Sequence, residues 1–495
     1  MPTVTPVLQN RPTASRLRHA GGALAHSVSA STWRRALEVR SADATVAASM
    51  RVGAAAALVF VGCGLLDLRQ YAGFAMLGAL ASAFARHEPM VRVAAKVTLV
   101  GALLVAFVAG GGLLALAHVP IWVEVALMSV GAAMAAASVS AFRITGPGPV
   151  ILVFAATAAV GYVTTTGDVV RTCLAAAIGA AVGLLALATP LLILPLGPAR
   201  LAVARALAAV AALEGGGPVE PARAALAQAR EKLALSGVRG NDSRHHSDLI
   251  VLLDEAETAV DDWAAGDSAR LFEVARHEAE LRKIKRRSTL FDNEVTVEVS
   301  ALPRPAGFVA TGLSGLRSRA VLGNAVRIAL AAACAGWFAA AVGLDHPLWA
   351  SMGAMAAMQG VSYALTVQRA IQRLLGNVGG AIIGALLIAA GLGYWPTVTA
   401  IVVLQVGAEL MAARSYALTS LAVTPMALLM VGLGAHISPE IGVSRIVDTL
   451  IGVAVGVIVA AVTISRSDLQ HLPASVRGMS APVGAAARGS LPLSR

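Results

Sequence analysis

The stretch that decides the fold of this protein is residues 93–117, with the sequence VAAKVTLVGALLVAFVAGGGLLALA. After Lys96 this stretch contains no charged side chain. A helix of about 20 apolar residues is long enough to cross the hydrocarbon core of a bilayer. A strand of a membrane barrel would instead alternate apolar and polar residues over about ten positions. The stretch therefore predicts a transmembrane α-helix.

The composition extends this prediction to most of the chain. Of 495 residues, 57% are apolar and 14% are charged, whereas about 25% of the residues in soluble domains are charged. Similar apolar stretches, among them residues 70–86 and 348–366, give six candidate spans within residues 46–198 and six within residues 321–466. We therefore expect an all-α polytopic membrane protein with two six-helix transmembrane regions.

The segment between these regions, residues 199–320, has the pattern of a soluble helical domain. Its apolar residues recur three and four positions apart with charged residues between them, which is the period of amphipathic helices. Residues 1–30 and 467–495 lack this period, and we expect the tails, residues 1–45 and 467–495, to be mostly disordered. Residues 31–48 could form an amphipathic helix on the membrane surface.

The distribution of charge predicts the topology. The formal net charge is +11, yet residues 199–320 contain equal numbers of basic and acidic residues, so the excess belongs to the tails and the membrane regions. A nucleic-acid partner would need a basic face on a soluble domain, and we expect none. Lys and Arg gather in the loops on the side of the N-terminus, as is typical of cytoplasmic loops. We therefore expect a multi-pass protein of the plasma or inner membrane, with both termini and the helical insert in the cytoplasm.

Motifs of enzymes and metal proteins do not occur in this sequence. There is no Walker nucleotide-binding motif, no Gly-x-Ser-x-Gly elbow and no His-Glu-x-x-His helix. Cys63, Cys173 and Cys334 lie within apolar stretches and lack the spacing of a zinc site or a disulfide framework. We expect neither an enzyme nor a cofactor or metal site.

The two transmembrane regions share residues at matching places. Arg51 opens the first region and Arg327 the second, and residues 67–73 (DLRQYAG) resemble residues 345–351 (DHPLWAS). Because six is an even number of crossings, both copies enter the membrane from the same side. This predicts parallel repeats related by an axis along the membrane normal, with any conduit at their interface.

Ionisable side chains within membrane spans are costly and usually functional. Three pairs of arginines occupy equivalent positions: Arg51 and Arg327, Arg92 and Arg373, and Arg143 and Arg414. We expect them to bind the carboxylate of a substrate at the cytoplasmic mouth; the alternative is that they anchor helix ends at the headgroups. Glu409 could carry a proton or pair with Arg414, and Asp448 could carry a proton or form an i,i+3 ion pair with Arg445.

Several glycines predict close helix packing. Gly376, Gly380 and Gly384 are spaced by four residues, which places them on one helix face. Gly452 lies in a similar small-residue stretch near the C-terminus, and we expect it to act in the same way.

Three segments carry a family resemblance: residues 345–350 (DHPLWA), 368–380 (QRAIQRLLGNVGG) and 445–452 (RIVDTLIG). Together they resemble the fusaric acid resistance protein family. The signature residues carried over by position are Trp349, Arg369, Arg373, Gly376, Gly380, Arg445, Asp448 and Gly452. Asn377 stands where the family often has threonine, and the first region agrees in layout more than in motif.

The resemblance implies efflux of aromatic carboxylic acids and related organic anions. We therefore expect a transporter that exports such anions along the interface of the two repeats, with the lipid bilayer and a small organic anion as its partners. A passive anion channel and a membrane scaffold that recruits cytoplasmic proteins are the alternatives. The sequence leaves open whether the chain forms a homo-oligomer.

Overall fold

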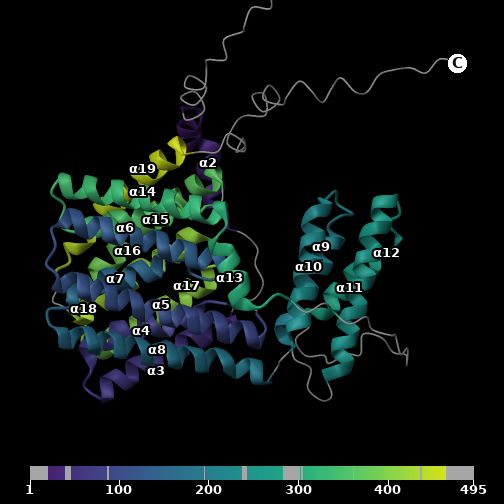
Figure 1. The fold of residues 1–495 in the computed structure, drawn as a ribbon, viewed down its shortest axis with the longest axis horizontal. Coiled ribbons are helices and arrows are strands. Elements are labelled where there is room, and N and C mark those ends of the chain that lie inside the picture. The colour runs from purple at the N-terminus through teal and green to yellow at the C-terminus, as the bar shows by residue number, and fades with distance from the viewer. Residues whose placement is uncertain are drawn as a thin grey trace, which may run out of the picture.

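The computed structural model describes residues 21–39, 46–85, 88–193, 196–236, 242–282, 302, 305–360, 362–434 and 437–463. Within these ranges every regular element is a helix. Figure 1 shows two parts, a broad bundle of long helices and a smaller helical bundle beside it.

Among the described residues, nine helices are long and apolar enough to cross a membrane. They are α3 (Val46–Leu65), α5 (Met90–Leu116), α6 (Ile121–Ala141), α8 (Thr166–Ile193), α14 (Arg319–Ala341), α16 (Tyr363–Ala389), α17 (Tyr394–Met411), α18 (Tyr416–Gly434) and α19 (Ile441–Val462). Helix α7 (Val150–Tyr162) is also apolar but shorter. The expected all-helical membrane fold is confirmed at this level.

Two of the expected spans are short, interrupted helices. One consists of η1 (Arg69–Tyr71), α4 (Ala72–Ala79) and η2 (Leu80–Ala83), and the other is α15 (Pro347–Ala357). At 1.5 Å per residue, α15 rises only about 16 Å, and all of its residues are buried. Non-helical backbone at membrane depth must be covered by protein. The prediction of two continuous helices at 70–86 and 348–366 is therefore wrong, because hydropathy reports apolar length but not helical continuity.

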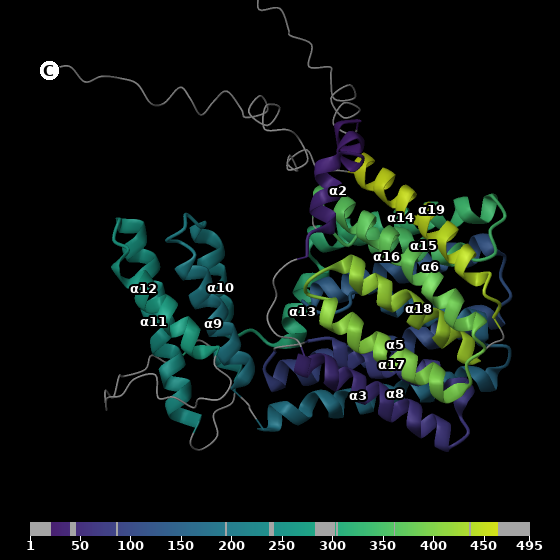
Figure 2. The ribbon, with the colours of Figure 1, turned by 180° about the vertical axis from the view of Figure 1, so that it is seen from behind.

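The four remaining long helices form a separate bundle: α9 (Gly197–Ala211), α10 (Val219–Leu235), α11 (Asp242–Ala265) and α12 (Ala269–Leu281). It has its own apolar core, which includes Leu207, Leu226, Leu253 and Leu271. Figures 1 and 2 show it beyond one end of the apolar helices. We call that end of the apolar bundle the insert end and the opposite end the far end. On which side of the membrane the insert lies stays a prediction.

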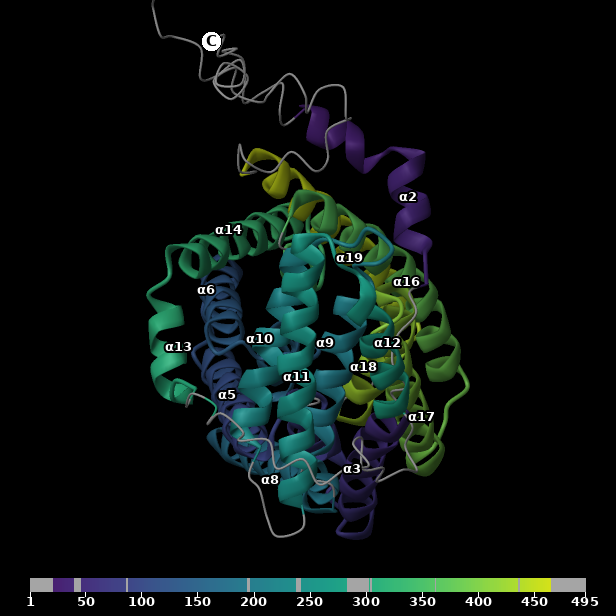
Figure 3. The ribbon, with the colours of Figure 1, turned by 90° about the vertical axis from the view of Figure 1, so that its right-hand side faces the viewer.

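The apolar bundle divides by sequence into a first half, α3 to α8, and a second half, α14 to α19. In the first half, α4 packs on α8, and α5 packs on both α7 and α8. The second half has the corresponding contacts: α15 packs on α19, and α16 packs on both α18 and α19. Between the halves, α14 packs against α6 and α3 against α17. Figure 3, which looks along the long helices, shows these last two pairs side by side.

Two short helices lie outside this arrangement. Helix α13 (Phe308–Leu316) precedes α14 and packs on α6. Helix α2 (Ala30–Leu37) packs on α16, where Gln372 Nε2 donates to the Ala36 carbonyl at 2.8 Å. Part of the tail predicted to be mostly disordered is thus a packed helix, which overlaps the 31–48 stretch expected to be amphipathic. The tail residues 1–20 and 467–495 lie outside the described residues.

Candidate functional site

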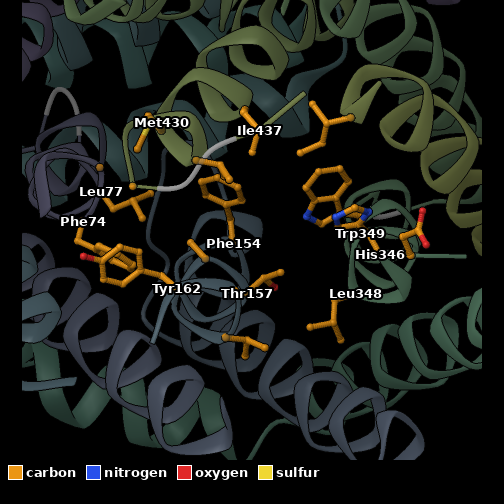
Figure 4. Close-up of a pocket in the computed structure, with 18 of the residues that line it drawn as sticks. Phe74, Leu77, Phe154, Thr157, Tyr162, His346, Leu348, Trp349, Met430 and Ile437 are labelled. Atoms are coloured by element: carbon orange, nitrogen blue, oxygen red, sulfur yellow. The ribbon is translucent and has the colours of Figure 1, made fainter. Parts of the chain in front are cut away.

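A cavity of about 470 Å³ lies between the two halves at the far end. Its walls come from α4, α6 and α7 of the first half and from α15, α18 and α19 of the second. Four aromatic side chains line it, Phe74, Phe154, Tyr162 and Trp349, and Figure 4 shows them around the cavity. Binding sites for small molecules typically enclose about 300–1,000 Å³, so this one could hold a molecule with a single aromatic ring.

Polar side chains also contribute to the cavity wall, namely Gln70, Glu124, Thr157, Asp345 and His346. Most of them come from the turns and helix ends at the far end. The wall is therefore aromatic and apolar with a few polar groups, which is the usual make-up of a small-molecule site.

His346 and Trp349 form one unit in this wall. Their rings are stacked with centroids 4.4 Å apart and an interplanar angle of 14°, and Figure 4 shows both at the same side of the cavity. Nδ1 of His346 is buried and has no hydrogen-bond partner among the described residues. Burial lowers the pKa of His346; Asp345 opposes this shift and Arg445 adds to it. The imidazole is therefore neutral at neutral pH.

Toward the insert end from the cavity, the short helices bury large apolar side chains almost completely. These are Met76, Leu80, Phe84, Met352, Met355 and Met358. The hydroxyl of Thr157, in the cavity wall, contacts Met352 Sδ at 3.9 Å. Protein therefore fills the interior on the insert side of the cavity.

The second half also holds a set of polar side chains that we call the polar cluster: Arg373 and Asn377 of α16, Tyr416 and Thr424 of α18, and Arg445, Asp448 and Thr449 of α19. Tyr416 is half-buried, and the others are buried. Asn377 Nδ2 donates to Thr449 Oγ1 at 2.9 Å, and Thr424 Oγ1 donates to Asn377 Oδ1 at 2.7 Å. Arg373 Nη1 donates to the Tyr416 hydroxyl at 3.1 Å. These bonds join three helices of the second half.

Among the described residues, no hydrogen bond joins Asp448 to the arginines of the polar cluster. The guanidinium of Arg445 lies over the ring of Trp349, 4.8 Å from its centroid. Asp448 is 1% exposed, and neither of its carboxylate oxygens has a hydrogen-bond partner among the described residues. Arg445 therefore contacts the aromatic face of Trp349, and the predicted i,i+3 ion pair between Arg445 and Asp448 stays a prediction.

The part of the chain that holds the polar cluster matches a known family. A family model described as fusaric acid resistance protein-like covers residues 331–459. These residues form a fusaric acid resistance-like domain. The domain runs from within α14 to within α19 and so includes Trp349 and the whole polar cluster.

Comparison with whole proteins gives a relative that matches part of this chain. It is similar to the "Uncharacterized membrane protein YvaC" of Bacillus subtilis (strain 168), with 28% identity over 194 residues. The matched stretch makes up 38% of this chain and 30% of the relative, so the chain matches less than a third of that protein's length. No solved structure matches the chain.

The six arginines predicted to bind substrate lie in different surroundings. Arg373 belongs to the polar cluster of the fusaric acid resistance-like domain. Arg92 Nη2 donates to Glu231 Oε1 of the insert at 3.3 Å, and Arg327 Nε donates to Thr463 Oγ1 at 2.9 Å. The remaining three are Arg51 and Arg414, which are half-buried, and Arg143, which is exposed. The structure thus separates Arg373 from the other five, and their role in anion binding stays a prediction.

Glu409, the second predicted acidic residue, is buried in α17. Its Oε1 accepts a hydrogen bond from Gln405 Nε2 at 3.1 Å, one helical turn earlier. Glu409 is not part of the cavity wall or of the polar cluster. A role in proton movement stays a prediction.

The predicted packing glycines lie at close helix contacts. A Cβ atom at Gly380 would lie 2.8 Å from the Leu421 carbonyl oxygen of α18, and one at Gly384 would lie 3.2 Å from Pro425 Cα. Gly376 faces the same helix, and Gly452 faces the backbone of α15 at Ala350. Side chains at these positions would separate the helices that hold the polar cluster.

Sequence reasoning missed the aromatic wall and the role of His346. Phe74, Phe154 and Tyr162 give no signal of their own, because an aromatic residue in an apolar span usually packs in the core. Thr424 and Thr449 did offer a signal, since each is a polar residue inside an apolar helix. Only the three-dimensional contacts show that they meet at Asn377.

Proposed function

We propose that the protein exports aromatic carboxylates or related small organic anions across the cell membrane, along the interface between two parallel six-helix repeats. The observation that carries this proposal is the cavity between the halves. Its volume and its aromatic side chains suit a single ring, and one wall residue, Trp349, also contacts the buried Arg445.

The packing of the helices supports the repeat arrangement. Most helix contacts within the first half have a counterpart in the second, and α14 packs on α6 as α3 packs on α17. The interrupted segment also occurs once in each half, as α4 with its flanking turns and as α15. Interrupted helices near a repeat interface are typical of the substrate sites of transporters.

The charges around the cavity support an anionic substrate. Helix α15 begins at the cavity with Pro347, so the positive end of its dipole faces that region. The buried charges of the polar cluster are two guanidinium groups, Arg373 and Arg445, and one acid, Asp448. Glu124 and Asp345 also line the cavity and would repel a carboxylate. We therefore expect the substrate's carboxylate to lie next to Trp349 and Arg445, with its ring between the aromatic side chains.

The filled interior favours a transporter over a permanently open channel. The cavity lies at the far end, which the loop charges predict to be outside, and buried side chains such as Met352 and Met355 occupy the insert side. An exporter that alternates between two conformations would present this state after it has opened outward. A passive anion channel would need an open path past these side chains.

Efflux from proteoliposomes tests the proposal. Liposomes loaded with radiolabelled benzoate are followed with and without a pH gradient, using empty liposomes as the background. Flux that responds to the pH gradient supports coupled export, and flux that ignores it supports a channel. No flux across a panel of aromatic and aliphatic carboxylates would refute transport and favour a scaffold.

A blocking substitution adds a test of the route. Thr157→Trp places a large side chain in the cavity and should abolish flux. Thr189→Trp, on the exposed side of α8, adds the same side chain away from the cavity and should leave flux unchanged. Equal flux in both variants would place the route elsewhere.

A further inference from the structure

Asp448 is the buried acid of the polar cluster, and its surroundings favour its neutral form. It is 1% exposed, and both of its oxygens lack hydrogen-bond partners among the described residues. An ionised carboxylate is strongly disfavoured when it is buried without donors, above all inside a membrane. The described conformation therefore suits a protonated Asp448.

Few charged groups face Asp448 from the helices around it. Helix α19 packs on α14, α15 and α16. From α16 comes Arg373, from the turn before α15 come Asp345 and His346, and α15 itself carries no ionisable residue. On α14 the basic residues are Arg319 and Arg327, and Arg327 binds Thr463 at the opposite end of α19. The neighbour best placed to pair with an ionised Asp448 is Arg445, one turn away on the same helix.

Arg445 has two alternative partners in this geometry. In the described conformation it lies against Trp349, which lines the cavity. If Asp448 loses its proton, the carboxylate can draw Arg445 into an i,i+3 ion pair and away from Trp349. A substrate carboxylate that reaches Trp349 would compete with Asp448 for the same guanidinium group.

We propose that Asp448 and the carboxylate of the transported anion compete for Arg445, so that each organic anion binds together with one proton. The proton passes from solvent to a carboxylate oxygen of Asp448, and no other bond forms or breaks. This inference rests on the proposed anion transport. For a monocarboxylate, the bound pair of anion and proton carries no net charge.

The stoichiometry is one proton per chain, because the first half lacks this site. Residues 178–183 (IGAAVG) correspond to residues 451–456 (IGVAVG). In that register Arg445 matches Thr172, and Asp448 matches Ala175. Neither residue of the first half can form the pair.

Isothermal titration of the purified full-length protein with benzoate tests the linkage. Titrations at about pH 6 to 9, where benzoate stays ionised, are repeated in two buffers of different ionisation enthalpy, which gives the number of protons taken up per anion. We expect about one proton per benzoate at high pH, where Asp448 starts ionised. The dissociation constant should rise about tenfold per pH unit in that range. Burial lowers the pKa of His346, so protonation of that ring is confined to the acid end of this range.

Variants assign the proton to its residue. Asp448→Asn should bind benzoate with no proton uptake and no pH dependence over the same range. Glu440→Gln, at the exposed start of α19, should keep the uptake of about one proton. If Asp448→Asn does not fold, the number of protons taken up per benzoate is compared between the wild-type protein and Glu409→Gln. Equal uptake supports the assignment to Asp448, and loss of uptake in Glu409→Gln would overturn it.

The two proposals fail in different ways. Benzoate binding without proton uptake at any pH would overturn this inference and leave anion transport standing. Uptake that persists in Asp448→Asn would overturn it as well. A wild-type protein that binds neither benzoate nor related carboxylates at any pH would overturn the proposed function and this inference with it.

Discussion

Replacing Trp349 with alanine should weaken benzoate binding and transport by about 60- to 300-fold. The side chain is 7% exposed, and its ring contacts both the Arg445 guanidinium and the His346 imidazole. A desolvated cation–π contact is worth about 2 kcal/mol, and an aromatic pair with the substrate ring adds about 0.5–1.5 kcal/mol. Loss of about 2.5–3.5 kcal/mol corresponds to that range at about 1.4 kcal/mol per factor of ten.

The measurement compares efflux and titration for three variants. Trp349→Phe keeps a ring with a weaker cation–π contact and should fall between wild type and Trp349→Ala. Trp122→Ala is the matched control, because Trp122 is half-exposed at the far end and accepts from Trp337 Nε1 through its backbone carbonyl, at 3.0 Å. Wild-type transport by Trp349→Ala, or an equal loss in Trp122→Ala, would refute the role of this ring.

Three further outcomes are expected. Arg373→Ala and Arg414→Ala should each weaken anion transport without changing the amount of protein in membranes. The loss in Arg373→Ala should be about tenfold or more, since a charged hydrogen bond is worth about 1.5–3 kcal/mol and Arg373 is buried against Tyr416. Unchanged efflux in both variants would make them anchoring residues. Gly380→Ala should lower the melting temperature in detergent, since its Cβ would meet α18 at a cost of about 1–3 kcal/mol. Gly407→Ala, where the added Cβ meets open space, should leave the melting temperature unchanged. Equal melting temperatures in the two variants would argue against the close contact. Burial lowers the pKa of His346 from 6.5, so the unfolded state takes up a proton before the folded state does as the pH falls below 6.5, and the free energy of unfolding drops there. His346→Gln should remove that part of the acid destabilisation. An unchanged profile of stability against pH would contradict this.

Hydropathy was enough to predict the helical membrane fold, and the three-to-four-residue spacing of apolar side chains was enough to predict the helices of residues 199–320. The long apolar stretches correspond to the nine long helices, and the amphipathic stretches of residues 199–320 correspond to α9 to α12. The interrupted segments at α4 and α15 were not predicted. Their residues are as apolar as those of a continuous span, and the break depends on burial by neighbouring helices.

The site was predictable only in part, for a similar reason. Arg373, Arg445 and Asp448 stood out as charges inside apolar stretches, and the structure brings them into one cluster. Their partners were not predictable, because Arg445 had both Asp448 and Trp349 within reach and only packing decides between them. Arg92 looked equivalent to Arg373 by position, yet it binds Glu231 of the insert, which no comparison of the two halves could reveal.

The contact between α3 and α17 has a consequence for biosynthesis. Tyr394 Oη donates to the Phe60 carbonyl at 2.7 Å across a separation of 334 residues. At roughly 5–20 residues per second, the ribosome needs roughly 15–70 s to reach α17 after α3 has been made. Until then the α3 face around Gly53 and Gly64, which Val406 and Tyr394 later cover, must be tolerated by lipid or shielded by the insertion machinery. Chains that terminate before α17 keep that face uncovered and are natural substrates for membrane quality control.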